Sequence, residues 1–110
     1  MKYKVLQRES TVLLFDRRDS INPRSSLQVM QVGDRGMIHT LMGPGFYKLL
    51  EVCGLAPFEE LGLHYVYAAV SDPHLSLMRT MLRNRVDVEP QGLCLIEDHY
   101  FNWVLLTKPK

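Results

Sequence analysis

The chain has 110 residues, of which 46% are hydrophobic and 23% charged, and its 13 basic and 12 acidic residues leave a formal net charge of +1. This length and composition indicate one globular domain with a single core. The near-neutral charge argues against a strongly electrostatic partner such as duplex DNA, so nucleic-acid binding is not expected.

The beginning of the chain and its cysteines indicate a cytoplasmic protein. Residues 1–8 lack the apolar core of a signal peptide, and no apolar run approaches the roughly 20 residues of a membrane-spanning helix, so no membrane partner is expected. Cys53 and Cys94 stand far apart and form no Cys-x-x-Cys pair, and we interpret both as free thiols that pack like small apolar side chains. No metal is expected, because the four histidines lack the spacing of a metal site: His39, His64, His74 and His99.

Short strands and turns are predicted in the first part of the chain. The segment 33–36, Gly-Asp-Arg-Gly, supplies turn chemistry, because glycine accepts a positive φ at little cost. It joins the two strands of the clearest hairpin. A polar stretch over 16–26 that contains a proline predicts an exposed loop. The strands expected in this part lie at 3–6, 11–15, 27–32 and 37–41.

Helices and strands alternate in the rest of the chain. A helix is predicted over 45–52, and Gly54 can cap it in a left-handed conformation. The segment 63–70 is apolar on both faces, which is typical of a strand in the middle of a sheet. A second helix is predicted to begin at Ser71-Asp72-Pro73. The remaining elements are a further helical turn at 57–61 and final strands at 93–96 and 103–106, joined by a tight connection.

The predicted order is β-β-β-β-α-β-α-β-β. It indicates a single α/β (α+β) domain over 1–110, with a mixed, mostly antiparallel sheet of about six to seven strands and two main helices. The triplet Gly43-Pro44-Gly45 follows a strand and precedes a helix, and ligands of open α/β sheets collect at such positions. Two interpretations stay open: the triplet presents backbone amides to a phosphate, or it only makes a tight connection.

The order of elements and the segment Thr40-Leu41-Met42-Gly43-Pro44-Gly45 resemble the GCN5-related N-acetyltransferases. In that family a Gln/Arg-x-x-Gly-x-Gly/Ala loop joins a strand to a helix, and 46–52 takes the place of this helix. The segment 58–70 looks like the end of a helix that leads into the fifth strand, and 71–78 looks like the beginning of the next helix. The last part of the match is closer to the acyl-homoserine-lactone and N-acyl amino acid synthases.

The resemblance implies that the chain binds a small-molecule thioester, an acyl-CoA or an acyl carrier, and transfers the acyl group to an amine. The backbone groups of Met37, Ile38, His39 and Thr40 would contact the pantetheine arm. The amides of Gly43, Gly45 and Phe46 would contact the pyrophosphate, because a helix N-terminus offers unpaired N–H donors. No catalytic residue is assigned, because the family's general-acid tyrosine falls near Met78 or Arg79.

A non-catalytic interaction module that works as an oligomer is the alternative. Only Arg8-Glu9-Ser10 lies between the first two strands, where the family has the helices of its acceptor site. The aromatic residues of the strands are expected to pack in the core and across strands: Tyr65, Tyr67, Tyr100, Phe101 and Trp103. If one sheet face lacked helices, some of them would be exposed, and such a face would serve a homodimer or another partner. The other polar groups are interpreted as solvated surface: Glu51, Glu59 and Glu60 on helices, and Glu97, Asp98 and His99 at a turn.

Overall fold

The computed structural model describes residues 2–15, 21–42, 46–82 and 84–108. Its strands are β1 (Lys2–Leu6), β2 (Thr11–Phe15), β3 (Ser25–Val32), β4 (Arg35–Met42), β5 (Tyr65–Val70), β6 (Asp87–Ile96) and β7 (His99–Thr107). Its helices are α1 (Phe46–Cys53), α2 (Ala56–Glu60) and α3 (Asp72–Leu82), with a 3-10 turn, η1, at Gln7–Glu9. No described helix is long and apolar enough to cross a membrane.

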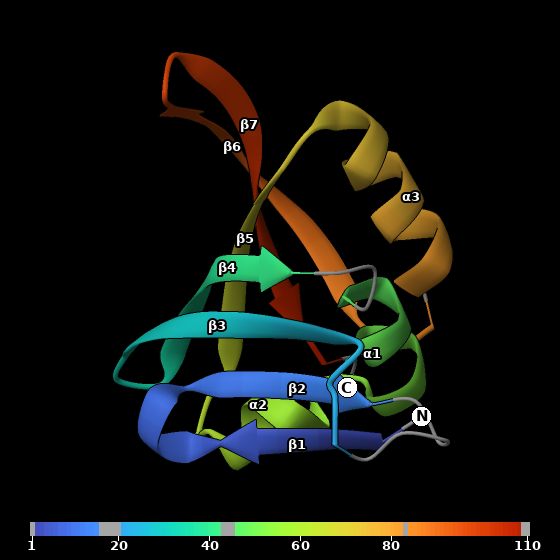
Figure 1. Cartoon of the computed structure of the whole chain (residues 1–110). Helices are drawn as coiled ribbons and strands as arrows, with labels where there is room; N and C mark the ends of the chain where they lie inside the picture. Colours follow the sequence, from blue (N-terminus) through green and yellow to red (C-terminus); the bar gives the residue numbers. More distant parts are fainter. Residues whose placement is uncertain (1, 16–20, 43–45, 83, 109–110) are drawn as a thin grey trace.

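The strands form one seven-stranded sheet in the order β1-β2-β3-β4-β5-β7-β6 (Figure 1). Every neighbouring pair is antiparallel except β4 and β5, which are parallel. The helices α1 and α2 make the connection that a parallel pair requires. The predicted mixed, mostly antiparallel sheet is therefore confirmed, and β5 lies in its interior as its apolar sequence indicates.

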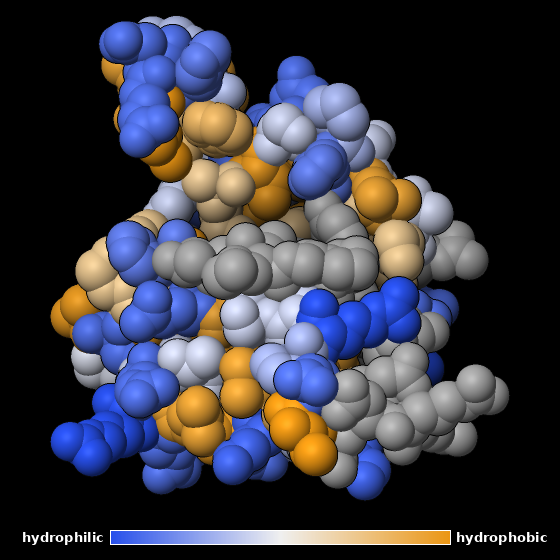
Figure 2. All heavy atoms as spheres, in the orientation of Figure 1, coloured by the Kyte–Doolittle hydropathy of each residue, from blue (hydrophilic) through white to orange (hydrophobic). Residues whose placement is uncertain are grey.

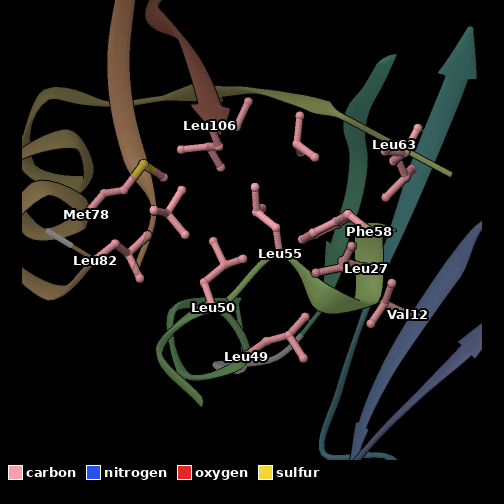
Figure 3. Close-up of a cluster of buried hydrophobic side chains, with 14 of the residues drawn as sticks. Val12, Leu27, Leu49, Leu50, Leu55, Phe58, Leu63, Met78, Leu82 and Leu106 are labelled. Atoms are coloured by element: carbon pink, nitrogen blue, oxygen red, sulfur yellow. The ribbon is translucent and has the colours of Figure 1, made fainter. Parts of the chain in front are cut away.

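The core occupies one face of the sheet. Alternate residues of the inner strands are buried there, for example Val66, Ala68 and Val70 on β5. Leucines of α1, Phe58 of α2 and Met78 of α3 pack against them in the same cluster (Figure 3). The opposite face carries the intervening residues, and no described helix packs on it. We call it the helix-free face.

Several boundaries differ from the sequence-based expectation. The turn expected at 33–36 is shorter, because β4 begins at Arg35, and the strand expected at 103–106 is β7, which spans His99–Thr107. The predicted loop over 16–26 ends earlier, because Ser25 and Ser26 pair with β2 and belong to β3. The strand expected at 93–96 begins at Asp87, because β7 pairs with it along its whole length. Tertiary pairing, which local sequence does not report, extends these strands.

Gly36 lies where β4 meets the core. A Cβ at this position would come within 2.6 Å of Leu63 Cδ1 and 2.6 Å of Val29 Cγ1, and both partners are buried. Any side chain here would therefore force the neighbouring strand or Leu63 to move.

We expect Gly36→Ala to lower the free energy of unfolding by about 1–3 kcal/mol, because extra volume in a packed core displaces its neighbours. Urea denaturation measures this loss. The control is a double-mutant cycle with Leu63→Ala, which removes the side chain that a Cβ at position 36 would meet. The double variant should then lose less stability than the sum of the losses of the two single variants. A loss in the double variant equal to the sum of the two single losses would contradict the clash.

Candidate functional site

The parallel pair of β4 and β5 opens towards the ends of both strands. Their register comprises Arg35↔Tyr65, Gly36↔Val66 and Met37↔Tyr67, and it ends there. β4 continues over 38–42 and β5 over 68–70 without pairing to each other, although both stay paired to their other neighbours. An opening between two adjacent strands therefore begins just after Met37.

A bulge on β4 lies at the same level. Val29 pairs with Ile38 and Gln28 pairs with Thr40, so His39 is the extra residue on β4. A bulge bends its strand and increases the local twist. This bend offers a physical reason why β4 leaves β5 here.

Alternation along the backbone of β4 determines whether each peptide group points to β3 or to β5. Val32 and Arg35 flank a two-residue turn whose first residue, Gly33, has φ of 62°. The peptide groups of such a flanking pair point at each other, so those of Gly36 and Ile38 point the other way, towards β5. The backbone of Ile38 thus stands at the mouth of the opening.

Gly43-Pro44-Gly45, which we call the glycine-rich corner, joins the end of β4 to the beginning of α1 in the chain. Gly43 and Gly45 lie outside the described residues, whereas Phe46 is the first residue of α1, close to the predicted beginning of this helix. The predicted ligand contacts at Met37, Ile38, His39 and Thr40 all lie on β4, along the parting edge. The structure therefore brings the described part of the predicted site to one strand edge and one helix N-terminus.

An aromatic cluster lies on the helix-free face beside the parting point. The Arg35 guanidinium lies 4.6 Å from the centre of the Tyr65 ring and donates a hydrogen bond of 2.5 Å to the Tyr67 hydroxyl. The Tyr67 ring stacks on Trp103 with 5.3 Å between ring centres. The sequence placed both tyrosines on one face, but the stacking and the role of Arg35 depend on which strands become neighbours.

Asn102 holds the far end of β5. Its Nδ2 donates to the carbonyl oxygen of Val70 at 3.2 Å and to Asp72 Oδ1 at 2.7 Å. Val70 is the last residue of β5 and Asp72 the first of α3. One side chain of β7 thus fixes the β5 side of the opening, a role that the sequence alone does not signal.

The other candidate polar side chains of the sequence do not gather at this opening. His39 and His64 are not brought together, because His64 precedes β5 and its amide donates to the Asp34 carbonyl at 2.8 Å, at the opposite end of the strand pair. Among the described residues, no group of three His, Cys, Asp or Glu side chains could hold a metal ion.

The carboxylates of α2 have surface partners. Glu59 lies 3.4 Å from Lys108 Nζ, and Glu60 accepts a hydrogen bond of 2.9 Å from the Tyr3 hydroxyl. This bond to a carboxylate is the main reason why the pKa of Tyr3 is raised. Glu59 and His64 also line a hollow of about 660 Å³, but it lies at the amino-terminal end of β5, away from the opening.

Solved structures share this architecture. Two chimeras of the spermidine N-acetyltransferase SpeG of Vibrio cholerae and hSSAT superpose with TM-scores of 0.57 and 0.58 over 87% of the chain, at 13% identity. A protein described as a phosphinothricin N-acetyltransferase superposes with a TM-score of 0.59 over 91% of the chain, also at 13% identity. The chain shares its fold with these three structures.

The match covers 66%, 64% and 71% of those three chains, so this chain spans about two thirds of their length. No family model and no curated protein matches the sequence. The N-acetyltransferase fold predicted from the order of elements is thus confirmed. The closer likeness to acyl-homoserine-lactone and N-acyl amino acid synthases stays a prediction, because all three structures are N-acetyltransferases.

We expect Asn102→Ala to lower the free energy of unfolding by about 1–3 kcal/mol, because one hydrogen bond to a carbonyl and one to a carboxylate are lost. Urea denaturation checks this. Gln91→Ala is the control, since the Gln91 side chain is exposed and its hydrogen bond within the described part of the chain is a long local one of 3.4 Å to the Glu89 carbonyl. Equal stability of the two variants would contradict the role of Asn102.

Proposed function

We propose that the chain binds an acyl-CoA or acyl-carrier thioester in the opening between β4 and β5 and transfers the acyl group to an amine. The observation that carries the proposal is the parting of the one parallel strand pair after Met37↔Tyr67, next to the bulge at His39. A strand edge without a partner can pair with the amides of a pantetheine arm. The fold shared with N-acetyltransferases supports the same use of this edge.

The beginning of α1 fits the phosphates of such a ligand. α1 has eight residues and begins at Phe46, directly after the glycine-rich corner. The first N–H groups of a helix have no partner within it, and the helix dipole attracts anions to this end. In this proposal the amides of Gly43, Gly45 and Phe46 bind the pyrophosphate.

Ser25 supplies a second observation at the same corner. Its side chain is 6% exposed, and its hydroxyl has no hydrogen-bond partner among the described residues. The next residue, Ser26, pairs with Met42 at the end of β4. A buried polar group without a partner is costly, so a polar ligand at this corner would account for it.

The chemistry requires little from side chains. The amine nitrogen attacks the thioester carbonyl carbon, a C–N bond forms, the C–S bond breaks, and the sulfur leaves as a thiolate that takes up the proton lost by the amine. The chain positions both groups, and backbone amides at the edge of β4 would stabilise the carbonyl oxygen as it gains charge. The cluster of Arg35, Tyr67 and Trp103 lies on the helix-free face, where Tyr67 belongs to the last pair of the ladder, and the amine would approach from this face.

A non-catalytic interaction module remains the second candidate, and one observation favours it. The family's general-acid tyrosine falls near Met78 or Arg79; Met78 is fully buried in the core, and an exposed arginine is a poor proton donor. Binding of coenzyme A without turnover of any acyl-CoA and amine would favour this second candidate over transfer.

We expect coenzyme A to raise the thermal midpoint of unfolding, because a ligand that binds only the folded state stabilises it. The variant Phe46→Pro removes one helix N–H at a position that tolerates proline and should weaken binding about tenfold to a hundredfold. Phe46→Ala is the matched control, since it loses the same ring but keeps the N–H. No shift with any acyl-CoA or acyl carrier would contradict the proposal.

Ser25→Ala separates ligand binding from folding. Its stability should be unchanged or slightly higher, because a buried hydroxyl without a described partner is removed. Its affinity for coenzyme A should fall several-fold if the hydroxyl serves the ligand. Isothermal titration and urea denaturation measure the two effects, and an unchanged affinity would exclude Ser25 from the site.

A further inference from the structure

β6 forms one edge of the sheet, and part of it carries no charge. In the order of the described strands it has β7 on one side and no strand on the other. Residues 91–96, Gln-Gly-Leu-Cys-Leu-Ile, include no ionisable group except the Cys94 thiol. Leu93 is 69% exposed, Leu95 58% and Ile96 44%. The hairpin of β6 and β7 projects beyond the body of the domain, and apolar residues lie among hydrophilic ones on it (Figures 1 and 2).

This stretch has the composition of an interior strand. Leu93 and Leu95 point to one face, and Cys94 and Ile96 point to the other, so both faces are apolar. Natural edge strands usually carry a charge, a proline or a bulge that prevents pairing with another chain. β6 has its proline, Pro90, and an irregularity between Pro90 and Gly92, but neither lies within 93–96. The outer half of the edge is therefore open to a further strand.

The hairpin turn determines which backbone groups are available. Glu97 and Asp98 have φ of 49° and 65°, which is typical of a two-residue type I′ turn, and Ile96 pairs with His99 across it. The flanking pair exchanges its hydrogen bonds, so the peptide groups of Ile96 and Cys94 point to β7. Those of Leu93 and Leu95 point outward to the open edge.

We propose that a second copy of this chain pairs its own β6 with this edge, antiparallel, about a two-fold axis at Cys94. Leu93 of each copy then exchanges backbone hydrogen bonds with Leu95 of the other, which satisfies all outward groups of both leucines. Cys94 faces Cys94 of the second copy as a non-hydrogen-bonded pair. Pro90, which lacks an N–H, falls at the end of the paired segment, opposite Asp98.

A second copy fits this edge better than another partner does. The same residues supply donors and acceptors in the same spacing on both sides, as a two-fold interface requires. Because residues 91–96 carry no charged side chain, they offer no electrostatic complement to a charged peptide. The four leucines become neighbours on one face, and Tyr100, which is 72% exposed and pairs with Leu95 on β7, extends this apolar surface.

The paired segment is short, so the interface belongs to the small class of protein contacts and the dimer depends on concentration. It gives a physical form to the homodimer expected from the sequence, and it places the contact at β6 and Tyr100 rather than at the stacked Tyr67 and Trp103. It does not depend on the proposed acyl transfer, because the edge lies on the far side of β7 from the opening between β4 and β5.

Crosslinking through Cys94 tests the register. A non-hydrogen-bonded pair separates its Cα atoms by about 4.5 Å, within the range of a disulfide. Diamide oxidises two thiols to a disulfide and is itself reduced, so it should convert the chain to a covalent dimer. Cys53→Ser should keep this product and Cys94→Ser should lose it. Burial raises the pKa of the Cys53 thiol, so its own reaction should be slow. Loss of the product in Cys53→Ser, or its persistence in Cys94→Ser, overturns the register.

Sedimentation across a range of concentrations tests the pairing itself. Leu95→Lys adds a charge to the edge and should raise the dimer dissociation constant at least about tenfold and reduce the crosslink, with the thermal midpoint little changed because Leu95 is exposed. Leu77→Lys is the matched control: Leu77 is 45% exposed on α3, and dimerisation should persist. A monomer at every concentration, or equal effects of both lysine variants, overturns the proposal.

Discussion

The short parallel ladder between β4 and β5 is the constraint on which the rest of the structure depends. On one side of it lie the antiparallel strands β1 to β4, and on the other lie β5, β7 and β6. Only the pairs from Arg35↔Tyr65 to Met37↔Tyr67 join the two parts of the sheet. Gly36 is central to this ladder, because its missing side chain lets Leu63 and Val29 pack directly against the backbone. The same ladder also fixes where the strands part.

One structural feature on each strand keeps the ends of β4 and β5 apart. The bulge at His39 bends β4, whereas Asn102 binds the last carbonyl of β5 and the first residue of α3. Both strands remain bonded to their outer neighbours, so the opening costs only the hydrogen bonds between them. A strand edge that stays open at this cost can receive an extended ligand with amide groups of its own.

The helices cover one sheet face, and this asymmetry sets what the other face can do. The chain spans about two thirds of the N-acetyltransferase structures that it resembles, and its first two strands are joined by the 3-10 turn η1. The Arg35, Tyr67 and Trp103 side chains therefore stay accessible beside the opening. The helix-free face thus presents aromatic rings with one guanidinium among them, packed together by stacking and cation–π contacts.

The amino-acid sequence determined the local elements, because their signals are short in range. Alternation gave the strands, Gly33 the hairpin turn, Ser71-Asp72-Pro73 the beginning of α3, and the apolar segment 63–70 an interior strand. These elements in their order were enough to predict the N-acetyltransferase fold, and the positions 37–40 and 46 of the candidate site followed from that likeness.

The tertiary structure decided what depends on neighbours distant in the chain. No local pattern states that β6 reaches back to Asp87, that His39 is a bulge, or that Asn102 ties β5 to α3, since each results from which strand lies alongside and in which register. The stacking of Tyr67 on Trp103 likewise depends on β5 and β7 being neighbours in the sheet. Side-chain spacing along one strand is fixed by covalent geometry, whereas pairing between strands is fixed only when the whole sheet packs on its core.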